Sequence, residues 1–148
     1  ALIAPLMKQV EVTATLGARF RVQCSAGAHT VLIDQPKAAM GEDAGPTPLD
    51  MILVAHAGCL ATIARIVATQ RRVALRGFEA KVSGDLDPDY LLGKTSEGRC
   101  GFTALRVEMR VDADLTDEQK RDFAHEVDRR CPVSDNLRAG TPMEVTVV

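Results

Sequence analysis

Residues 47–70 read TPLDMILVAHAGCLATIARIVATQ, and this stretch decides which fold we expect. Its length and apolar composition are typical of one long helix. Thr47 is suited to the N-cap, Pro48 to the first helical position, and Asp50 to the position from which a side chain completes a capping box. The sequence therefore predicts a helix that begins directly after Thr47.

The middle of this helix offers almost no polar surface. Between Met51 and Ala68 only His56, Thr62 and Arg65 interrupt the apolar residues, so we expect the helix to be buried on every side. A membrane span is the alternative, but the run is short for a span, contains a histidine and an arginine, and stands alone in an otherwise amphipathic chain. Because a chain of this length covers only part of a helix surface, all-round burial predicts a dimer.

Alternating apolar and polar residues predict strands on both sides of the helix. The predicted strands cover residues 10–16, 19–24, 30–33, 73–82, 103–111 and 143–148. The first three, with turns at residues 17–18 and 25–28, form a meander, and Gly77 predicts a bulge in the fourth. Residues 34–46 contain two prolines and two glycines and are expected to form an ordered loop.

A second helix is predicted near the C-terminal end. Thr116 and Gln119 have the spacing of a capping box, the apolar positions that follow leave a charged face, and Pro132 ends the pattern. Residues 134–139 are expected to form a helical turn. The order is three strands, a buried helix, two strands, an amphipathic helix and a final strand, which predicts one α+β domain over residues 1–148.

Composition narrows the range of partners. Among 148 residues, 18 basic and 20 acidic side chains give a net charge of -2, and there are four Phe, one Tyr and no Trp. A chain without a basic surplus or aromatic platforms is not expected to bind nucleic acid. Residues 1–7 are apolar but lack the basic segment and cleavage site of an export signal, so we expect a cytoplasmic protein with no membrane partner.

The cysteines are spaced too widely for a disulfide framework or a CxxC zinc site. They occupy positions 24, 59, 100 and 131. The histidines, at positions 29, 56 and 125, do not have metal-ligand spacing either. We therefore expect free thiols in a reducing compartment, no metal, and any cysteine function to be redox or nucleophilic.

Each candidate reactive residue has a structural alternative. Cys59 in the middle of the long helix is either a small apolar filler or a nucleophile, and Cys131 is either structural or a thiolate stabilised by unpaired N–H groups at a helix start. His56 lies one turn before Cys59, which allows a Cys-His acyl-transfer site. A core histidine bonded to backbone is favoured over that site, because no third orienting residue is visible.

Three motifs stand out together: GPTPLD at residues 45–50, AHAGC at residues 55–59 within the apolar helix, and CPVS at residues 131–134. In this arrangement the sequence resembles the OsmC/Ohr family of osmotically induced and organic-hydroperoxide-resistance proteins. The resemblance extends from the meander to the final strand. The Asp34-Gln-Pro run and the Gly-Pro-Thr-Pro sequence are closer to the OsmC-like branch than to Ohr proper.

This resemblance implies an intertwined homodimer, with the central helices in its core, that reduces organic hydroperoxides through thiols. Cys59 would be the peroxidatic cysteine and Cys131 the resolving one. Arg19, in the matching hairpin where Arg21 also lies, would support the thiolate. The family's glutamate falls on Leu49, so only the shorter Asp50 is available as the second supporting group.

The implied chemistry uses no metal or organic cofactor, and it requires an external dithiol of lipoyl type as reductant. The apolar helix wall around Cys59 favours apolar peroxides as substrates. A second hypothesis is a non-catalytic OsmC-like dimer that binds a ligand or is associated with stress, with structural thiols.

Overall fold

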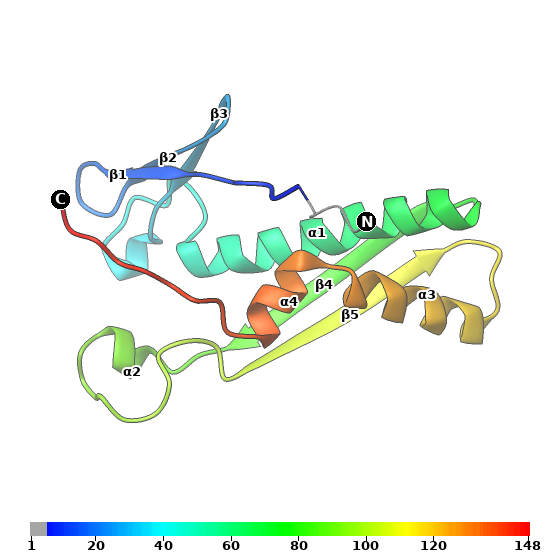
Figure 1. Cartoon of the computed structure of the whole chain (residues 1–148). Helices are drawn as coiled ribbons and strands as arrows, with labels where there is room; N and C mark the ends of the chain where they lie inside the picture. The colour runs from blue at the N-terminus through cyan, green and yellow to red at the C-terminus, as the bar shows by residue number, and fades with distance from the viewer. Residues whose placement is uncertain (1–5) are drawn as a thin grey trace. The chain divides into compact units, whose positions relative to one another are not determined.

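The computed structural model describes residues 6–148. Contacts divide the chain into two compact units, Ala1–Met51 and Ile52–Val148, and each is described by itself. Strands and helices are both present, as the α+β prediction requires (Figure 1). The prediction of a single domain stays a prediction.

The first unit contains the predicted meander. Its strands are β1 (Thr13–Leu16), β2 (Val22–Ala26) and β3 (His29–Ile33), antiparallel and in the order β1-β2-β3. The expected start of the second strand at Arg19 is wrong. The N–H of Gly17 donates to the Arg21 carbonyl at 2.8 Å, and Arg19 has a φ of 56°, a left-handed conformation that leaves the strand region.

The loop after β3 is ordered around one buried carboxylate. Asp34 is 1% exposed, and its side chain accepts the backbone N–H groups of Gln35, Glu42 and Ala44. A carboxylate that binds three amides holds a chain that has no regular structure of its own apart from the 3-10 turn Lys37–Ala39. The predicted ordered loop is confirmed.

The long helix α1 (Pro48–Arg71) begins where the capping motif predicts. The Thr47 Oγ1 accepts the N–H of Asp50 at 3.1 Å, and the Asp50 carboxylate accepts the N–H of Thr47 at 3.0 Å. Two of the N–H groups that a helix start leaves unpaired are therefore satisfied within four residues.

The second unit pairs two long strands and adds helices. Its elements after α1 are β4 (Gly77–Asp85), α2 (Pro88–Leu91), β5 (Ala104–Asp112), α3 (Asp117–Arg129) and α4 (Pro132–Arg138). The register runs without interruption from Gly77 opposite Asp112 to the other end of β4, so the predicted bulge at Gly77 is wrong. The strand begins at Gly77 rather than Val73, because the Val73 N–H donates to the Ala68 carbonyl at the end of α1.

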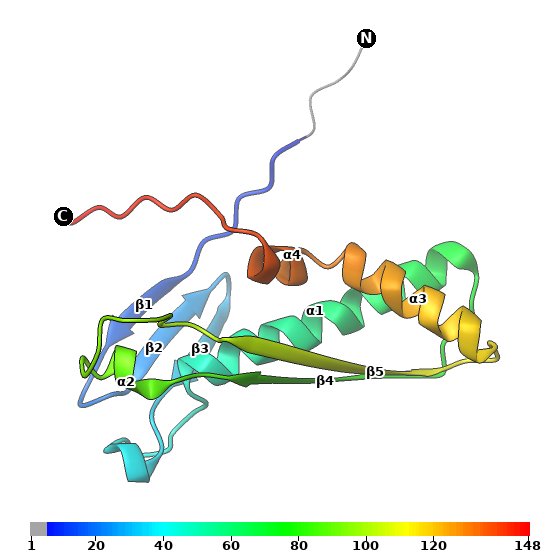
Figure 2. The same cartoon turned by 90° about the horizontal axis from the view of Figure 1, so that it is seen from below.

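Side chains from α1, β5 and α3 form the core of this unit. Figures 1 and 2 show the course of these three elements. The fully buried large side chains of the core include Leu60 and Val67 of α1 and Phe123 and Val127 of α3. The capping box of α3 is formed as predicted, with Thr116 as its N-cap. This core places α1 next to α4, the helix that begins directly after Cys131.

The single chain buries only one stripe of α1, and burial on every side, for which the sequence requires a second copy, stays a prediction. The buried residues are His56, Leu60, Ala64, Val67 and Ala68. In contrast, Ile52, Val54 and Ile66 keep 38%, 56% and 39% of their surface exposed. By length and a mean hydropathy of 1.9, α1 could also cross a membrane, but core helices of soluble proteins pass the same test.

The predicted last strand, Met143–Val148, is not formed. These residues are extended, and Val145 and Val147 are more than four-fifths exposed. An extended segment becomes a strand only when another strand edge accepts its hydrogen bonds, and within residues 6–148 none does.

Candidate active site

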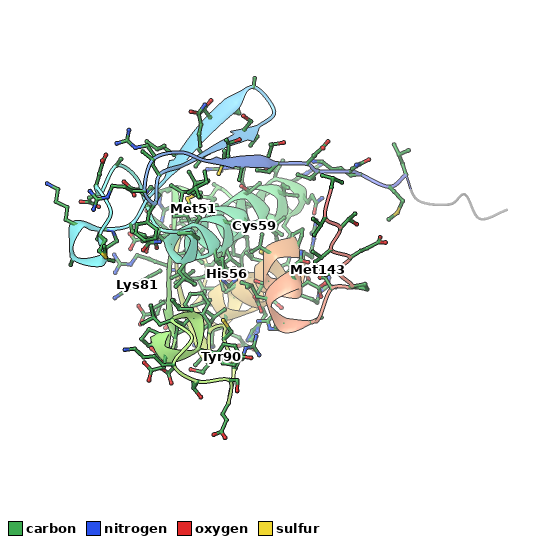
Figure 3. The ribbon with its side chains drawn as sticks, turned by 90° about the vertical axis from the view of Figure 1, so that its left-hand side faces the viewer. Met51, His56, Cys59, Lys81, Tyr90 and Met143 are labelled. Atoms are coloured by element: carbon green, nitrogen blue, oxygen red, sulfur yellow. The ribbon has the colours of Figure 1, made fainter. Side chains whose placement is uncertain are left out.

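Cys59 of α1 and Cys131 of the α3–α4 connection meet in the second unit. The Cys59 thiol lies within hydrogen-bonding reach of Cys131, and both side chains belong to the same apolar cluster. Cys131 is 1% exposed, whereas Cys59 is partly exposed. The structure therefore brings together the two thiols that the sequence analysis selected. Figure 3, seen nearly along α1, labels Cys59 and His56 on this helix.

The first turn of α4 directs one backbone amide at each sulfur. The Val133 N–H donates to the Cys59 sulfur. The next amide, that of Ser134, donates to the Cys131 Sγ at 3.4 Å. Pro132 occupies the first helical position, where its fixed φ favours a helix start. Two consecutive residues of one turn therefore hold the two thiols.

The surroundings of Cys59 favour its neutral form. Burial raises the pKa of the Cys59 thiol, and the neighbouring Cys131 raises it further, while the Val133 N–H acts in the opposite direction. A thiol with a raised pKa is a poor nucleophile at neutral pH. Full reactivity therefore calls for a cation beside Cys59.

His56 is bonded to a side chain on α4. Its Nε2 lies 2.7 Å from the Ser134 Oγ, and the ring is 4% exposed. The expectation of a bond to backbone is wrong, and the contact to Ser134 leaves the Cys-His acyl-transfer hypothesis without the hydrogen bond that it needs. Burial lowers the pKa of His56; among nearby charges Asp128 raises it and Arg138 lowers it.

Asp128 of α3 completes this polar cluster. The Arg138 Nη2 donates to the Asp128 Oδ2 at 2.6 Å. Partial burial by itself raises the pKa of the Asp128 carboxyl, but hydrogen bonds from Arg138 and from the Ser134 hydroxyl outweigh burial and hold that pKa below its usual value. Ser134 therefore contacts both His56 and Asp128.

From the sequence, Ser134 was recognised only as part of the CPVS motif, and Asp128 was not recognised as a site residue. Asp128 precedes Cys131 by three positions, as His56 precedes Cys59, so both flank a cysteine at helical spacing. This three-residue spacing to a cysteine is the signal from which Asp128 could have been found in the sequence.

A pocket of about 460 Å³ opens next to the polar cluster. It is lined by α1, β5, α4 and the loop before β5, with apolar walls from Ile52, Phe102, Leu105 and Leu137. His56 and Ser134 form its polar part, and Arg99 and Arg138 lie at its wall. The pocket suits a small organic molecule with an apolar body.

The other predicted site residues belong to the first unit, where they have local partners. The Arg19 Nη2 donates to the Met40 carbonyl at 2.7 Å, and Arg21 pairs with Glu42 at 2.5 Å. Asp50 bonds the Thr47 amide of its own capping box. The structural role that the sequence assigned to Asp50 is confirmed, and a catalytic role for Asp50 or Arg19 stays a prediction.

The two remaining cysteines lie elsewhere. Cys24 is buried in β2, and Cys100 is exposed in the loop before β5. Over residues 6–148, no group of three or more His, Cys, Asp or Glu side chains is placed to hold a metal ion.

Comparison with known proteins identifies the fold. A hydroperoxide reductase of Mycoplasma genitalium is 21% identical over 141 residues, which are 95% of this chain and 94% of that protein. An OsmC-like protein of Mycoplasma pneumoniae superimposes with a TM-score of 0.79 at 18% identity, covering 91% of each chain. An organic hydroperoxide resistance protein of Elizabethkingia anophelis gives a TM-score of 0.65 at 20% identity, covering 93% of each chain.

The profile of the family described as OsmC-like protein matches residues 41–146. This match includes both cysteines of the site and most of the chain. The resemblance seen in the sequence is confirmed, and the chain belongs to the OsmC-like protein family.

Proposed function

We propose that this protein is a cysteine-based peroxidase that reduces organic hydroperoxides. The observation that carries the proposal is the contact of Cys59 with Cys131, two thiols that lie 72 positions apart in the sequence. The hydroperoxide reductase of Mycoplasma genitalium, similar over 95% of this chain, supports the same activity.

The reaction needs two thiols. The Cys59 thiolate attacks the terminal oxygen of the hydroperoxide, the O–O bond breaks, and the products are an alkoxide, which takes a proton to become an alcohol, and a Cys59 sulfenic acid. The Cys131 thiol then attacks the Cys59 sulfur, and a disulfide and water form. The partly exposed Cys59 suits the first step and the buried Cys131 the second.

Turnover needs two electrons from outside the protein. An external dithiol of lipoyl type reduces the Cys59–Cys131 disulfide and leaves as its own cyclic disulfide. The protein itself needs no metal or organic cofactor in this scheme. We place the reaction in the cytoplasm, where reducing conditions maintain the four thiols.

Arg19 is our candidate for the cation that Cys59 needs. A guanidinium beside the sulfur favours the thiolate and the departing oxygen, and the Asp50 carboxylate would hold that guanidinium. Asp50 precedes Cys59 by nine residues, a rise of about 13 Å and roughly half a turn away on the helix surface. Asp50 and Cys59 of one α1 therefore lie far apart and on opposite faces, so we propose that a second copy of the chain completes the site.

Two surfaces of the single chain support a homodimer. The apolar residues Ile52, Val54 and Ile66 of α1 are exposed, and residues 143–148 are extended and pair with no strand among residues 6–148. A second copy would cover both. Sedimentation velocity is expected to show a dimer that Val54→Asp dissociates, while Leu92→Asp, an equally exposed position outside α1, leaves it intact. A monomeric parent protein would refute the shared site.

The decisive experiment for the activity is intact mass after one equivalent of cumene hydroperoxide. We expect a loss of two hydrogens per chain, with peptide mapping assigning the disulfide to Cys59 and Cys131. Replacing Cys24 and Cys100 by Ser should not change this result. Unreactive thiols would support the non-catalytic dimer instead, and a stable thioester formed with an activated acyl compound would revive the acyl-transfer hypothesis.

The role of Arg19 is tested by the pH dependence of Cys59 alkylation. Arg19→Met should shift the alkylation profile of Cys59 to higher pH, because the thiolate loses its cation. Arg21→Met is the matched control, and it should leave the profile unchanged. Equal profiles for both variants and the parent protein would remove Arg19 from the site.

A further inference from the structure

Close to the thiols, the Ser134 hydroxyl is bonded by two other polar side chains, those of His56 and Asp128. The Ser134 hydroxyl contacts His56 Nε2 at 2.7 Å and also the Asp128 carboxylate. Ser134 is 2% exposed and His56 is 4% exposed. Burying polar groups in this way is costly unless they bond one another, so their arrangement needs an explanation beyond a solvated surface.

The direction of these hydrogen bonds follows from the chemistry of the groups. The Asp128 carboxylate, ionised and bonded to Arg138, only accepts, so the single proton of the Ser134 hydroxyl points to Asp128. The Ser134 oxygen then accepts a hydrogen bond from His56, which carries its hydrogen on Nε2. The hydroxyl is held from two sides, by α1 and by α3, and cannot rotate freely.

Ser134 also touches the reacting groups through its backbone. Its N–H donates to the Cys131 Sγ at 3.4 Å, and the preceding N–H, that of Val133, donates to the Cys59 sulfur. The residue whose side chain bonds His56 and Asp128 therefore also supplies the amide that bonds the Cys131 sulfur. A shift of Ser134 would move this hydrogen bond and with it the Cys131 thiol.

We call His56, Ser134 and Asp128 the clamp, and its two outer residues lie at the same distance in sequence from the two cysteines. His56 is three residues before Cys59, and Asp128 is three residues before Cys131. Ser134 contacts both, so it ties the turn of α1 next to one cysteine to the end of α3 next to the other. A disulfide accepts only a narrow range of sulfur separations and dihedral angles, so such a tie bears directly on the step that forms it.

We propose that Ser134, clamped between His56 and Asp128, is a positioning residue for the formation of the Cys59–Cys131 disulfide. This inference deepens the proposed function and rests on it. Ser134 takes no part in bond making. It holds the Cys131 sulfur at the angle from which it attacks Cys59, while the reaction of Cys59 with peroxide does not depend on it.

Single-turnover kinetics separate the two steps. In Ser134→Ala, the consumption of cumene hydroperoxide should stay within about twofold of the parent protein, while disulfide formation slows by about 10- to 100-fold and the Cys59 sulfenic acid accumulates for trapping by a dimedone probe. Ser134→Thr keeps the hydroxyl and should restore most of the rate. Equal slowing of both steps, or no rescue by Thr, would overturn the proposal.

A stability control separates positioning from general loosening of α4. Asn136→Ala removes the hydrogen bond from the Asn136 side chain to the Pro132 carbonyl, within the same helix and away from the clamp. Its melting temperature should fall, but the disulfide step should keep the parent rate. If Asn136→Ala slows that step as much as Ser134→Ala does, Ser134 acts only through helix stability.

A peroxide-independent measurement keeps this test apart from the proposed function. In a Cys24→Ser, Cys100→Ser background, an aromatic disulfide such as Ellman's reagent releases one thiolate as it forms a mixed disulfide on Cys59. A second thiolate is released when Cys131 displaces the first adduct. The second phase should slow in Ser134→Ala and in His56→Leu, and His56→Gln, which retains an N–H donor, should recover part of the rate.

The two sets of results distinguish the two ideas. If peroxide leaves the parent thiols unchanged but Ser134→Ala still slows the second phase, the peroxidase proposal fails and the positioning role holds. If the second phase has the same rate in all these variants, the positioning role fails whatever peroxide does.

Discussion

The starts of α3 and α4 have the same local form and opposite surroundings. At α3, the Thr116 Oγ1 accepts the Gln119 N–H at 3.2 Å, and the Gln119 side chain accepts the Thr116 N–H in return at 2.9 Å. At α4, the Cys131 Sγ accepts the Ser134 N–H at 3.4 Å, but the Ser134 side chain turns away to His56. The first cap is exposed and the second is buried.

The difference separates a structural cap from one that also serves the site. Oxygen is a better hydrogen-bond acceptor than sulfur. In a capping box, the side chain at the third helical position normally bonds back to the N–H of the N-cap residue. The start of α4 replaces the oxygen by a sulfur and uses its serine for contacts to α1 and α3. A weaker helix start thus places a reactive thiol against Cys59.

The largest expected effect comes from placing an oxygen at the second cap. In Cys131→Ser the disulfide cannot form, so peroxidase turnover with the dithiol should fall to background while a dimedone probe labels Cys59. Because a hydroxyl is a good cap, the free energy of unfolding should change by less than about 1 kcal/mol. Activity assays and denaturant titration check both parts. Turnover at the parent rate would mean that another thiol resolves Cys59.

The next effect concerns the ion pair behind the second cap. Asp128→Asn should lower the free energy of unfolding by about 1–2 kcal/mol at pH 7, because the hydrogen bonds to Arg138 and Ser134 lose their charge. The pKa of Asp128 is lowered in the folded protein, so this stability is present above about pH 4 and is lost as pH falls through the folded-state pKa. Urea titrations should converge for the two proteins in acid.

The exposed cap of α3 should affect stability alone. Thr116→Ala should reduce the free energy of unfolding by about 1 kcal/mol and leave both chemical steps at the parent rate. Urea titration and single-turnover kinetics measure the two quantities. A loss of activity from this variant would remove the contrast between the two helix starts.

The smallest expected effect is the contribution of His56 to the pH dependence of the free energy of unfolding. Its pKa is lowered in the folded protein, mainly by burial. The unfolded chain therefore binds this proton more readily, and stability should decline as pH falls below about 6.5. His56→Gln should flatten this part of the stability curve by about 1 kcal/mol or less between pH 6.5 and 5.5. Parallel curves for the two proteins would contradict the buried neutral histidine.

Features that depend on neighbours in the sequence were predictable from the sequence alone. The capping boxes at Thr47 and Thr116 each join residues three positions apart, and both form as expected. Alternation identified the meander and β5, because a half-buried strand repeats every two residues. The family could likewise be identified from three short motifs. The wrong predictions concern the ends of strands, namely the bulge at Gly77, where β4 begins, and the final strand over residues 143–148.

Only the tertiary structure decided which polar groups meet at the thiols. His56 and Ser134 are 78 positions apart, and the bond between them has no local period or motif. The same holds for the contact of Cys59 with Cys131, which the sequence alone suggested through a family resemblance. Local hydrogen bonds follow from backbone geometry over a few residues, whereas these contacts depend on how α1, α3 and α4 pack around Phe123 and Leu60, which no single segment specifies.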